Sequence, residues 1–567
     1  MTDTTRLLTP WGENYKSENW QIYPRPQMKR DSFFCLNGQW DFCVANKNES
    51  PLFDRKIEVP FAPQSILSGI EEIFDNDKNL FYRKEFTLPQ NFNKGRVILH
   101  FGAVDQKATV ILNGNLIGEH SGGYDAFSFD ITPYIEEQNI LMVEVADNLD
   151  DYRLPYGKQS KNRGGIWYTE ISGIWQTVWI ESVPEKYIKG LKIDADDHSV
   201  TITAEGVETG VVTIGEVSLP LCEGKVTYIP ENPQLWSPEH PHLYSFKIQS
   251  GEDCVESYFA MRKLEIKEVD GYPRLCLNGK AYFFHGLLDQ GYYSDGIYTP
   301  ASPEAYEFDI IKMKELGFNM LRKHIKVEPQ LFYYYCDRLG MVVFQDMVNN
   351  GKYSFFRDTA LPTIFGGKFN LNDRLLHRNA DSRKEFEVGM IKTVKQLYNH
   401  PSICYWTIFN EGWGQFCANE MYEKLCLLDH SRFIDSASGW FGGVNSDVDS
   451  RHIYFRKLNL KCTDKPLVLS EFGGYSYKLQ DHSFNLYKTF GYKKLKSRED
   501  FIKAFADLYE TQVLPLAKKG LSAAVYTQVS DVEDETNGLL TYDRKVEKIF
   551  PNEFIETSAK LTEENNH

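Results

Sequence analysis

The sequence predicts a multidomain protein of the β plus α/β class, in which two β-sandwich domains precede a C-terminal (β/α)₈ barrel. Three observations lead to this expectation. The chain has 567 residues, too many to surround one hydrophobic core. Short alternating strand patterns with Gly- and Asn-rich turns run to about residue 265. Beyond that point, buried strand patterns alternate with amphipathic helix patterns, as in parallel α/β folds.

Residues 1–182 form the first predicted domain. Apolar and polar residues alternate in runs such as GRVILHFGAV (95–104) and ATVILNG (108–114), and Asn113-Gly114 and Gly122-Gly123 supply turns between them. No helical period lasts for more than a turn or two. Many short strands joined by tight turns are typical of a sandwich or jelly roll, so we expect a jelly-roll β-sandwich here.

Residues 183–268 form the second predicted domain. The period-two pattern continues in HSVTITAEG (198–206) and GVVTIGEVSLPL (210–221). Roughly 80 residues of strands are the size of a small immunoglobulin-like sandwich, and we predict that fold for this segment.

Residues 269–567 show the pattern of a TIM barrel. SPEAYEFDIIKMKELG (302–317) has helical periodicity, and a long irregular segment spans 348–380. A doubly wound open sheet is the rival fold, but the chain has no GxGxxG or P-loop motif that would favour it. Eight strands separated by helices or long loops are the order of a (β/α)₈ barrel. The predicted strands are 281–289, 318–324, 341–347, 403–411, 433–440, 452–455, 466–473 and 522–528.

Composition narrows the function classes. The hydrophobic share of 42% and the charged share of 25% are ordinary for globular proteins. The net charge is −16 and no Lys/Arg block occurs, so we expect no nucleic-acid partner. No apolar run has the roughly 18 residues of a membrane span, and the N-terminus lacks a signal-like apolar segment. We therefore expect a cytoplasmic protein without a membrane partner, whose ten cysteines are buried free thiols.

Two glutamates end predicted barrel strands. Glu411 closes ICYWTIFNE, the fourth strand, and Glu471 closes PLVLSE, the seventh. Because active sites of such barrels lie at the carboxyl ends of the strands, both carboxylates should face one mouth. A protonated and an ionised carboxyl group in one cleft are what glycoside hydrolysis requires. Two solvated strand ends without catalytic function are the alternative reading of this spacing.

The surroundings of the two glutamates fit a sugar site. Asn410 could bond a sugar hydroxyl, and Trp413 and Trp440 offer aromatic faces to sugar rings. Gly412 and Gly474 would let the backbone approach a ligand closely.

The same residues carry a resemblance to a known family. LNGQWDF (36–42), HSGGYDAFSFDIT (120–132), PQLWSPEHPHLYSFKI (233–248), NEGWGQF (410–416) and SEFGG (470–474) occur in the order of its motifs. Over about residues 10–550 the chain resembles glycoside hydrolase family 2, the group of β-galactosidases, β-glucuronidases and β-mannosidases, in a compact three-domain branch. The resemblance implies that the jelly roll is a sugar-binding-like domain.

The resemblance also implies site roles and a retaining double-displacement mechanism. Glu411 is similar to the family's acid/base and Glu471 to its nucleophile. Tyr454 resembles the tyrosine that hydrogen-bonds the nucleophile, and Asn410 resembles the residue that contacts the sugar 2-hydroxyl. No cofactor is implied.

Two departures from the family bear on substrate and metal. Glucuronidases carry an Asn-x-Lys pair after the nucleophile, and none occurs downstream of Glu471. Large β-galactosidases carry a magnesium-binding Glu-x-His after the third strand, where this chain has Asp346 without such a pair. We therefore expect no metal and disfavour glucuronides.

Further strand-end residues are candidates for the pocket. Arg322 is either substrate-facing or an internal brace to a carboxylate. Arg163 and Trp167 lie in a Gly-rich loop of the first domain that either reaches the barrel mouth or packs as a turn. The acidic run 531–535 is expected to be a solvated loop. As substrate ligands we predict Asp289, His324, Asp346, His452 and Tyr526, in addition to Asn410, Trp413, Trp440 and Tyr454.

These observations predict a retaining exo-glycosidase that acts on terminal β-linked sugars, with β-galactosides leading. Mannosides, glucosaminides and galactofuranosides or arabinofuranosides are alternatives. A non-catalytic carbohydrate-binding protein and a transglycosylase are the other function classes left open. The carbohydrate substrate is the main expected partner, and a homodimer through the β domains is the expected assembly.

Overall fold

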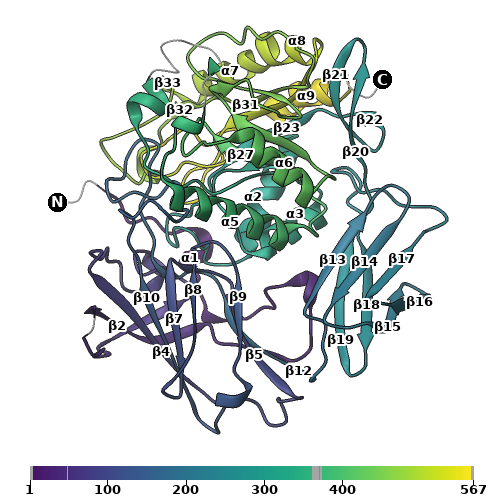
Figure 1. Ribbon diagram of the computed structural model, residues 1–567. Helices are drawn as coiled ribbons and strands as arrows, with labels where there is room; N and C mark the ends of the chain where they lie inside the picture. The colour runs from purple at the N-terminus through teal and green to yellow at the C-terminus, as the bar shows by residue number, and fades with distance from the viewer. Residues whose placement is uncertain (1–3, 48, 361–368, 371–372, 564–567) are drawn as a thin grey trace.

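The computed structural model describes residues 4–47, 49–360, 369–370 and 373–563. Figure 1 shows three bodies: the jelly roll in purple and blue, the immunoglobulin-like sandwich beside it in teal, and the barrel above both in green and yellow. This arrangement confirms the predicted fold class. No helix within the described ranges is long and apolar enough to cross a membrane.

The jelly roll packs two antiparallel sheets face to face. One sheet has the order β1-β12-β5-β9 and the other the order β3-β2-β4-β10-β7-β8. Alternating apolar residues of both sheets, such as Trp40, Val110 and Ile180, are fully buried between them. The strands are β1 Phe33–Cys35, β2 Gly38–Asn46, β3 Arg55–Val59, β4 Lys78–Phe86, β5 Arg96–Phe101, β6 Val104–Asp105, β7 Lys107–Leu112, β8 Asn115–Ser121, β9 Phe127–Asp130, β10 Asn139–Ala146, β11 Gly173–Ile174 and β12 Val178–Val183.

The second domain is one antiparallel ladder folded around a small core. Its hydrogen-bonded order is β13-β14-β17-β16-β15-β18-β19, and Ile202, Val212 and Ile248 point into the core. The strands are β13 Gly190–Ala195, β14 Val200–Glu205, β15 Thr209–Ile214, β16 Val217–Cys222, β17 Lys225–Tyr228, β18 Tyr244–Ser250 and β19 Asp253–Phe259.

A three-stranded sheet connects this domain to the barrel and covers the barrel's amino-terminal end. It consists of β20 Leu264–Val269, β21 Tyr272–Leu277 and β22 Lys280–Ala281. Arg274 donates to the carbonyls of Leu521 and Ala517 at 2.8 Å each, which ties the sheet to the start of the last barrel strand. The covered end is therefore structural, and the opposite end is free to bind ligands.

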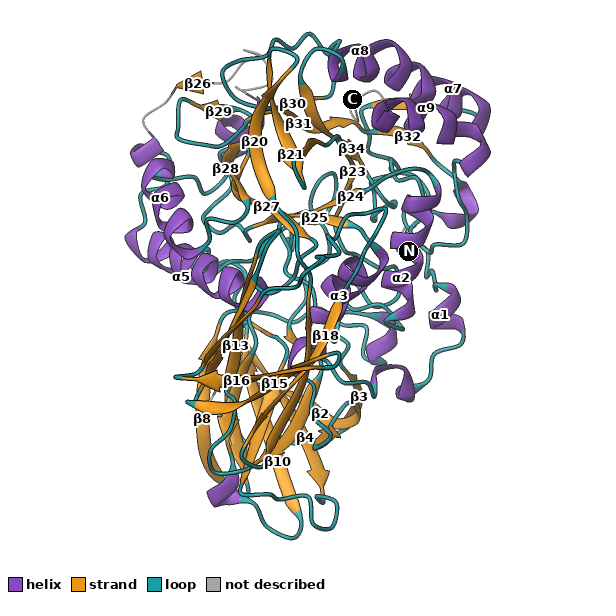
Figure 2. Ribbon diagram, turned by 90° about the vertical axis from the view of Figure 1, so that its right-hand side faces the viewer, coloured by secondary structure: helices purple, strands orange, loops and turns teal. Residues whose placement is uncertain are grey.

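Eight strands form the barrel ladder in the order β28-β27-β25-β24-β23-β34-β31-β30, and all pairings are parallel. Figure 2 shows helices on the outside of these strands. The strands are β23 Phe284–Asp289, β24 Met320–Lys323, β25 Val342–Asp346, β27 Ile403–Asn410, β28 Phe433–Ser438, β30 Asp449–Ile453, β31 Leu467–Gly473 and β34 Leu521–Thr527. The main helices are α2 Glu304–Glu315, α3 Gln330–Leu339, α5 Ala380–Leu397, α6 Ala418–Leu428, α7 Arg498–Leu508 and α9 Pro551–Glu563.

Two details differ from the sequence-based expectation. The helical pattern of REDFIKAFADLYETQVLPLAKKG (498–520) predicts one long helix, but a π-helical turn, Tyr509–Val513, interrupts it before α8 Leu514–Ala517. Cys222 and Cys254 are exposed rather than buried, because they lie on the outward side of strands or turns in the second domain. Part of the predicted irregular segment 348–380, namely 361–368 and 371–372, lies outside the described residues.

Candidate active site

A cleft of about 950 Å³ opens at the carboxyl ends of the barrel strands. Its strand-end wall is formed by residues that end or directly follow barrel strands: His324, Glu411, His452, Tyr454, Glu471 and Thr527. Its loop wall is formed by residues carried on loops: Lys158, Trp167, Tyr353, Tyr492 and Glu535. The volume is that of a site for a small molecule such as a glycoside.

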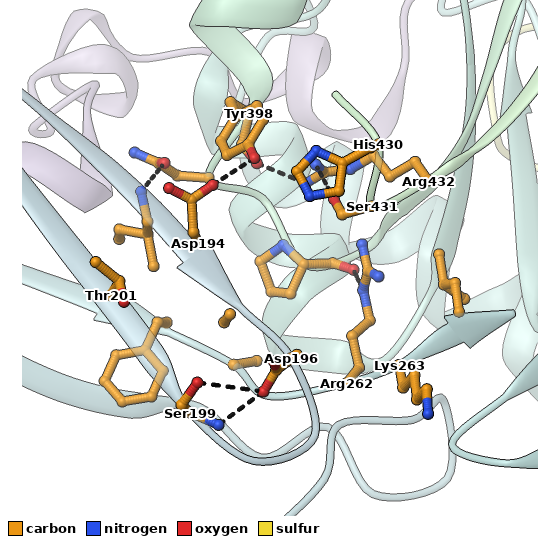
Figure 3. A pocket seen from close by; sticks show the side chains of 17 residues that line it. Asp194, Asp196, Ser199, Thr201, Arg262, Lys263, Tyr398, His430, Ser431 and Arg432 are labelled. Atoms are coloured by element: carbon orange, nitrogen blue, oxygen red, sulfur yellow. Dashed lines mark hydrogen bonds between the residues drawn. The ribbon is translucent and has the colours of Figure 1, made fainter. Parts of the chain in front are cut away.

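A smaller cavity of about 370 Å³ lies between the second domain and the barrel (Figure 3). Two of its polar side chains, Arg262 and Tyr398, are already bonded within the protein. Arg262 donates to the carbonyls of Pro401 and Ile403 at 2.6 and 2.7 Å, and Tyr398 donates to Asp194 at 2.5 Å. These bonds join the two domains, so this cavity is structural.

Glu411 occupies a sharp turn at the end of β27. Every residue of β27 is buried, and Glu411 itself has a φ of +53°, a left-handed conformation that is unusual outside glycine. Its backbone N–H donates to the carbonyl of Ser438 at 2.9 Å. Gly412 follows with a φ of +72°, and a Cβ at that position would lie 2.0 Å from the ring of Phe441. The glycine is required by this turn, which directs the Glu411 carboxyl into the cleft.

The carboxyl group of Glu411 is held by an imidazole. Its Oε1 lies 2.9 Å from Nδ1 of His452, and Nε2 of that ring lies 2.8 Å from Oγ of Ser438. Burial lowers the pKa of His452 to about 3, so the imidazole is neutral. Burial also raises the pKa of Glu411, while the charge of Lys158 is the largest effect that lowers it. A carboxyl group in this setting favours its protonated form.

Glu471 receives hydrogen bonds on both oxygens. Arg322 donates to Oε1 at 3.1 Å, and the hydroxyl of Tyr454 donates to Oε2. Its side chain is 6% exposed. Donors on both oxygens stabilise an ionised carboxylate, in contrast to the setting of Glu411.

The two carboxyl groups share one cavity. Glu411, His452 and Glu471 each offer an atom within 4.8 Å of the others. Retaining glycosidases place their two carboxyl groups roughly 5–5.5 Å apart, and inverting enzymes about 6.5–9.5 Å apart. These side-chain types also bind metals, but the guanidinium of Arg322 already neutralises Glu471, which opposes a dication there. We assign no metal to this group.

Arg322 organises the strand-end wall. It is fully buried and donates to Asp346 at 3.0 Å, to Asn410 at 2.9 Å and to the carbonyl of Ser470 at 2.9 Å, in addition to Glu471. Although burial raises the pKa of Asp346, the Arg322 charge and other donors lower it overall. Of the two readings of Arg322, the internal brace is the one that the structure displays.

His324 joins the same network from the cleft side. Its Nδ1 lies 2.7 Å from Asp346, burial lowers its pKa, and its ring lines the cleft. Asp346 itself does not line the cleft, because Arg322 and His324 cover both of its oxygens. Asp346 was predicted to contact the substrate, but in the structure it bonds Arg322 and His324 and so supports the wall of the cleft.

Four other predicted ligands are also not among the residues that line the cleft: Asn410, Asp289, Trp413 and Tyr526. Asn410 is buried and accepts from Arg322 through Oδ1. Asp289 bonds Lys323 at 2.6 Å and the Gly291 N–H at 2.9 Å. Trp413 is buried: its ring lies 5.1 Å from that of Trp167, and its Nε1–H donates to the carbonyl of Gly351 at 2.9 Å.

Tyr526 is fully buried, and its hydroxyl accepts from the Tyr475 N–H at 3.0 Å. Together with Asp346, these residues support the walls of the cleft and do not line it. The cleft is lined by four of the predicted substrate ligands: Trp440, His452, Tyr454 and His324.

The loop wall holds residues that the sequence analysis missed or misread. Trp167 reaches the cleft, and Arg163 instead pairs with Glu533 at 3.5 Å. The prediction of a solvated acidic loop over 531–535 is wrong, because all four acidic residues are at least 95% buried. Asp531 pairs with Lys548 at 2.6 Å, and Glu535 accepts from Gln528 at 2.7 Å. Burial raises the pKa of Glu535 to about 7.

Family models cover most of the chain. Residues 55–167 match a model described as "Glycosyl hydrolase 2 galactose-binding domain-like". Residues 187–262 match "Glycosyl hydrolases family 2", and residues 270–550 match "Glycosyl hydrolases family 2, TIM barrel domain". The three matches follow the order of the three structural bodies.

Among curated proteins, a β-galactosidase of Thermoanaerobacter pseudethanolicus is 26% identical over 390 residues, which cover 60% of this chain and 52% of that protein. The chain therefore spans about half the length of that relative. A β-glucuronidase of Streptococcus agalactiae is 22% identical over 520 residues, 80% of this chain and 84% of that one.

Among solved structures, a GH2 β-galacturonidase from Eisenbergiella tayi has a TM-score of 0.71 at 18% identity and covers 96% of this chain and 100% of its own. At this identity the likeness concerns the fold alone.

Proposed function

The chain belongs to glycoside hydrolase family 2, and from that premise we propose that it is a retaining exo-glycosidase acting on a neutral, β-galactoside-like terminal sugar. One observation carries the proposal. Glu411 and Glu471 offer oxygens within 4.8 Å of each other, yet only Glu471 receives donors that stabilise its ionised form on both oxygens. The pair thus has the short spacing that a retaining mechanism needs, and its two carboxyl groups lie in the different hydrogen-bonding environments that an acid and a nucleophile require.

In the first step, the Glu411 carboxyl group donates its proton to the glycosidic oxygen as the leaving group departs. The Glu471 carboxylate attacks the anomeric carbon and forms a glycosyl ester. Arg322 and Tyr454 hold both Glu471 oxygens and so fix the direction of attack. Asn410 accepts from Arg322 through Oδ1, which leaves its amide group to donate to the sugar 2-hydroxyl.

In the second step, Glu411 acts as the base. Formation of the ester removes the negative charge of Glu471, so the pKa of Glu411 falls and its carboxylate can take a proton from water. The water attacks the anomeric carbon and the ester bond to Glu471 breaks. Two inversions give net retention of configuration.

The charge inside the cleft supports a neutral sugar. The carboxyl group of Glu535 lines the cleft close enough for Glu471 to raise its pKa further. An additional carboxylate on the sugar would meet these acids. Uronides are the second candidate, since Lys158, Arg451 and Lys457 also line the cleft and could balance such a charge.

A panel of 4-nitrophenyl glycosides tests the proposal. We expect hydrolysis of the β-galactopyranoside above the β-mannoside, β-glucosaminide, β-galactofuranoside and β-glucuronide, with the β-anomer as the first product by NMR. Glu471→Gln is the control for contaminating activity. Hydrolysis of uronides alone would overturn the neutral-sugar assignment, and an α-anomer as first product would overturn the retaining mechanism.

A further inference from the structure

Lys158 presents an ammonium group to the cleft, and no described residue forms a hydrogen bond or ion pair with it. The residue is 8% exposed and lines the cleft beside Trp167, whose ring centroid lies 5.8 Å from Nζ. Among the residues that the structure describes, none is within hydrogen-bond or ion-pair distance of Nζ. A cation that faces a cleft and is not paired with a protein carboxylate is free to bind a polar ligand there.

The loop of the first domain holds Lys158 rigidly against the barrel. Before it, Tyr156 donates to the carbonyl of Gly351 at 2.9 Å, and a Cβ on Gly157 would lie 2.9 Å from the carbonyl of Ile325. After it, Gln159 donates to Asp105 of the jelly roll at 2.9 Å. Since both neighbours are fixed, one to each domain, the position of Lys158 does not depend on a flexible loop.

Three ionisable groups of the cleft respond to the Lys158 charge. That charge lowers the pKa values of Glu411, Glu535 and His324. Glu411 and His324 follow strands β27 and β24, and Glu535 lies in the loop after β34. The ammonium therefore acts on groups from three different parts of the mouth, and Trp440 and His452 line the same cleft.

We infer that Lys158 and Glu535 together bind hydroxyl groups of the terminal sugar and determine which sugar is accepted. The ammonium donates to one hydroxyl oxygen, and the Glu535 carboxyl group bonds a neighbouring hydroxyl. This inference rests on the proposed function and names its recognition residues. A donor of fixed charge beside an acceptor suits two adjacent hydroxyls of a neutral sugar, because one group supplies protons and the other takes them.

The same pair explains why a sugar carboxylate fits poorly. Lys158 alone would attract a sugar carboxylate, whereas Glu535 would repel it. Glu535 accepts a hydrogen bond from Gln528, and Gln528 in turn accepts one from Gln290 at 2.9 Å. Glu535 therefore cannot move aside without breaking these hydrogen bonds. Replacing Glu535 by glutamine should therefore shift selectivity toward uronides, while loss of Lys158 should not.

The decisive experiment combines enzyme and substrate deletions. Lys158→Met removes the ammonium and keeps the length of the side chain. With 4-nitrophenyl β-galactoside we expect kcat/KM to fall about 10- to 100-fold, the loss typical of a hydrogen bond to a charged group. Among the 3-, 4- and 6-deoxygalactosides, one should lower kcat/KM of the wild type by a similar factor, because it lacks the hydroxyl that Lys158 binds. For Lys158→Met, kcat/KM on that deoxy substrate should equal its kcat/KM on the parent galactoside.

The pH profile supplies a second readout that a merely structural role would not move. Glu411 must be protonated for the first step, so kcat/KM falls as pH rises through its pKa. Because the Lys158 charge lowers that pKa, Lys158→Met should move the alkaline limb to higher pH. Lys158→Arg should retain the wild-type limb. Lys161→Met is the matched control, since Lys161 belongs to the same loop and bonds Asn76 outside the cleft.

The outcomes separate the two proposals. If the wild type cleaves galactosides but Lys158→Met matches it on every deoxy substrate, the inference about Lys158 fails and the proposed function stands. A second outcome is that the wild type cleaves only uronides and that Lys158→Met selectively abolishes this activity. The neutral-sugar function would then fail, and Lys158 would be a residue that binds the sugar carboxylate. That result would also contradict the proposed pairing of Lys158 with Glu535. Equal losses on all deoxy substrates with an unmoved alkaline limb would contradict a hydroxyl contact.

Discussion

The two walls of the cleft are built in different ways. In the strand-end wall, the catalytic carboxyl groups are already bonded within the protein: His452 lies 2.9 Å from Glu411, and Arg322 donates to Glu471 and also joins Asp346 and Asn410. In the loop wall, the ammonium of Lys158 has no hydrogen-bond or ion-pair partner among the described residues, and burial raises the pKa of Glu535. The strand-end wall is thus preorganised for chemistry, and the loop wall is left to be completed by a ligand.

The difference teaches how chemistry and selectivity can vary separately in this molecule. Strand ends of a parallel barrel are fixed by the backbone ladder, so the distance between Glu411 and Glu471 is a property of the fold. Lys158 comes from a loop of another domain, and its replacement leaves that distance unchanged. Changes in the strand-end wall should therefore cost more activity than changes in the loop wall.

The largest effect is expected for Glu471→Gln. Removing the nucleophile should lower kcat by about four orders of magnitude or more, because no other group can form the ester. Stopped assays with an activated dinitrophenyl glycoside measure the residual rate. For Glu471→Ala, added azide should restore turnover and give the α-glycosyl azide. Activity within tenfold of wild type would show that another residue attacks.

A smaller and substrate-dependent effect is expected for Glu411→Gln. Loss of the acid should reduce turnover of methyl glycosides about 10²- to 10⁴-fold, the range of general acid–base catalysis. A dinitrophenyl leaving group needs no proton, so its first step should be nearly unaffected. Comparison of the two substrates under single-turnover conditions checks this. Equal losses on both would remove Glu411 from the acid role.

The strand-end wall also predicts a shape for the pH profile. Burial raises the pKa of Glu411 above its usual 4.5, so the protonated acid persists above that pH. The alkaline limb of kcat/KM should therefore lie above pH 4.5 and report this group. Glu411→Gln assayed with the dinitrophenyl substrate should lack the limb. A limb that persists unchanged in this variant belongs to another residue.

The smallest expected effect concerns stability and lies in the loop wall. The pKa of Glu535 is raised to about 7 in the folded chain, so its folded form binds a proton that the unfolded form releases above about 4.5. Folding stability is lost as pH rises from about 4.5 through 7, by at most about 3 kcal/mol from this group.

The glutamine of Glu535→Gln does not titrate, so this variant escapes the loss of stability. The melting temperature of Glu535→Gln minus that of the wild type should therefore increase from pH 5 to pH 8. Asp531→Asn is a comparison, since burial raises the pKa of Asp531 to about 6. If the difference in melting temperature between Glu535→Gln and the wild type stayed the same from pH 5 to pH 8, a raised pKa of Glu535 would be contradicted.

The sequence could predict the barrel and the two glutamates because both depend on periodic patterns. A strand followed by an acid places that acid at the barrel mouth, and this is where Glu411 and Glu471 lie. The position of Trp413 could not be predicted in this way, since the positive φ of Glu411 and Gly412 turns the chain away from the cleft.

Lys158 and Glu535 show the limit more clearly. Lys158 lies in an irregular loop, and its approach to the barrel depends on contacts between distant residues, such as Tyr156 and Gly351, which are 195 positions apart. Glu535 was misread because an acidic run usually faces water. Here Arg163 and a backbone N–H bond Glu533, Lys548 pairs with Asp531, and Gln528 donates to Glu535. Such pairings are set by tertiary contacts that no local pattern encodes.

Trapping the covalent intermediate tests the central claim most directly. A 2-deoxy-2-fluorogalactoside with a dinitrophenyl leaving group should slow both steps and let the ester accumulate. Mass spectrometry of the intact protein and of its peptides should then show one added fluoroglycosyl group, attached to Glu471. A label on a different side chain, or steady inverting turnover without any label, would contradict the account.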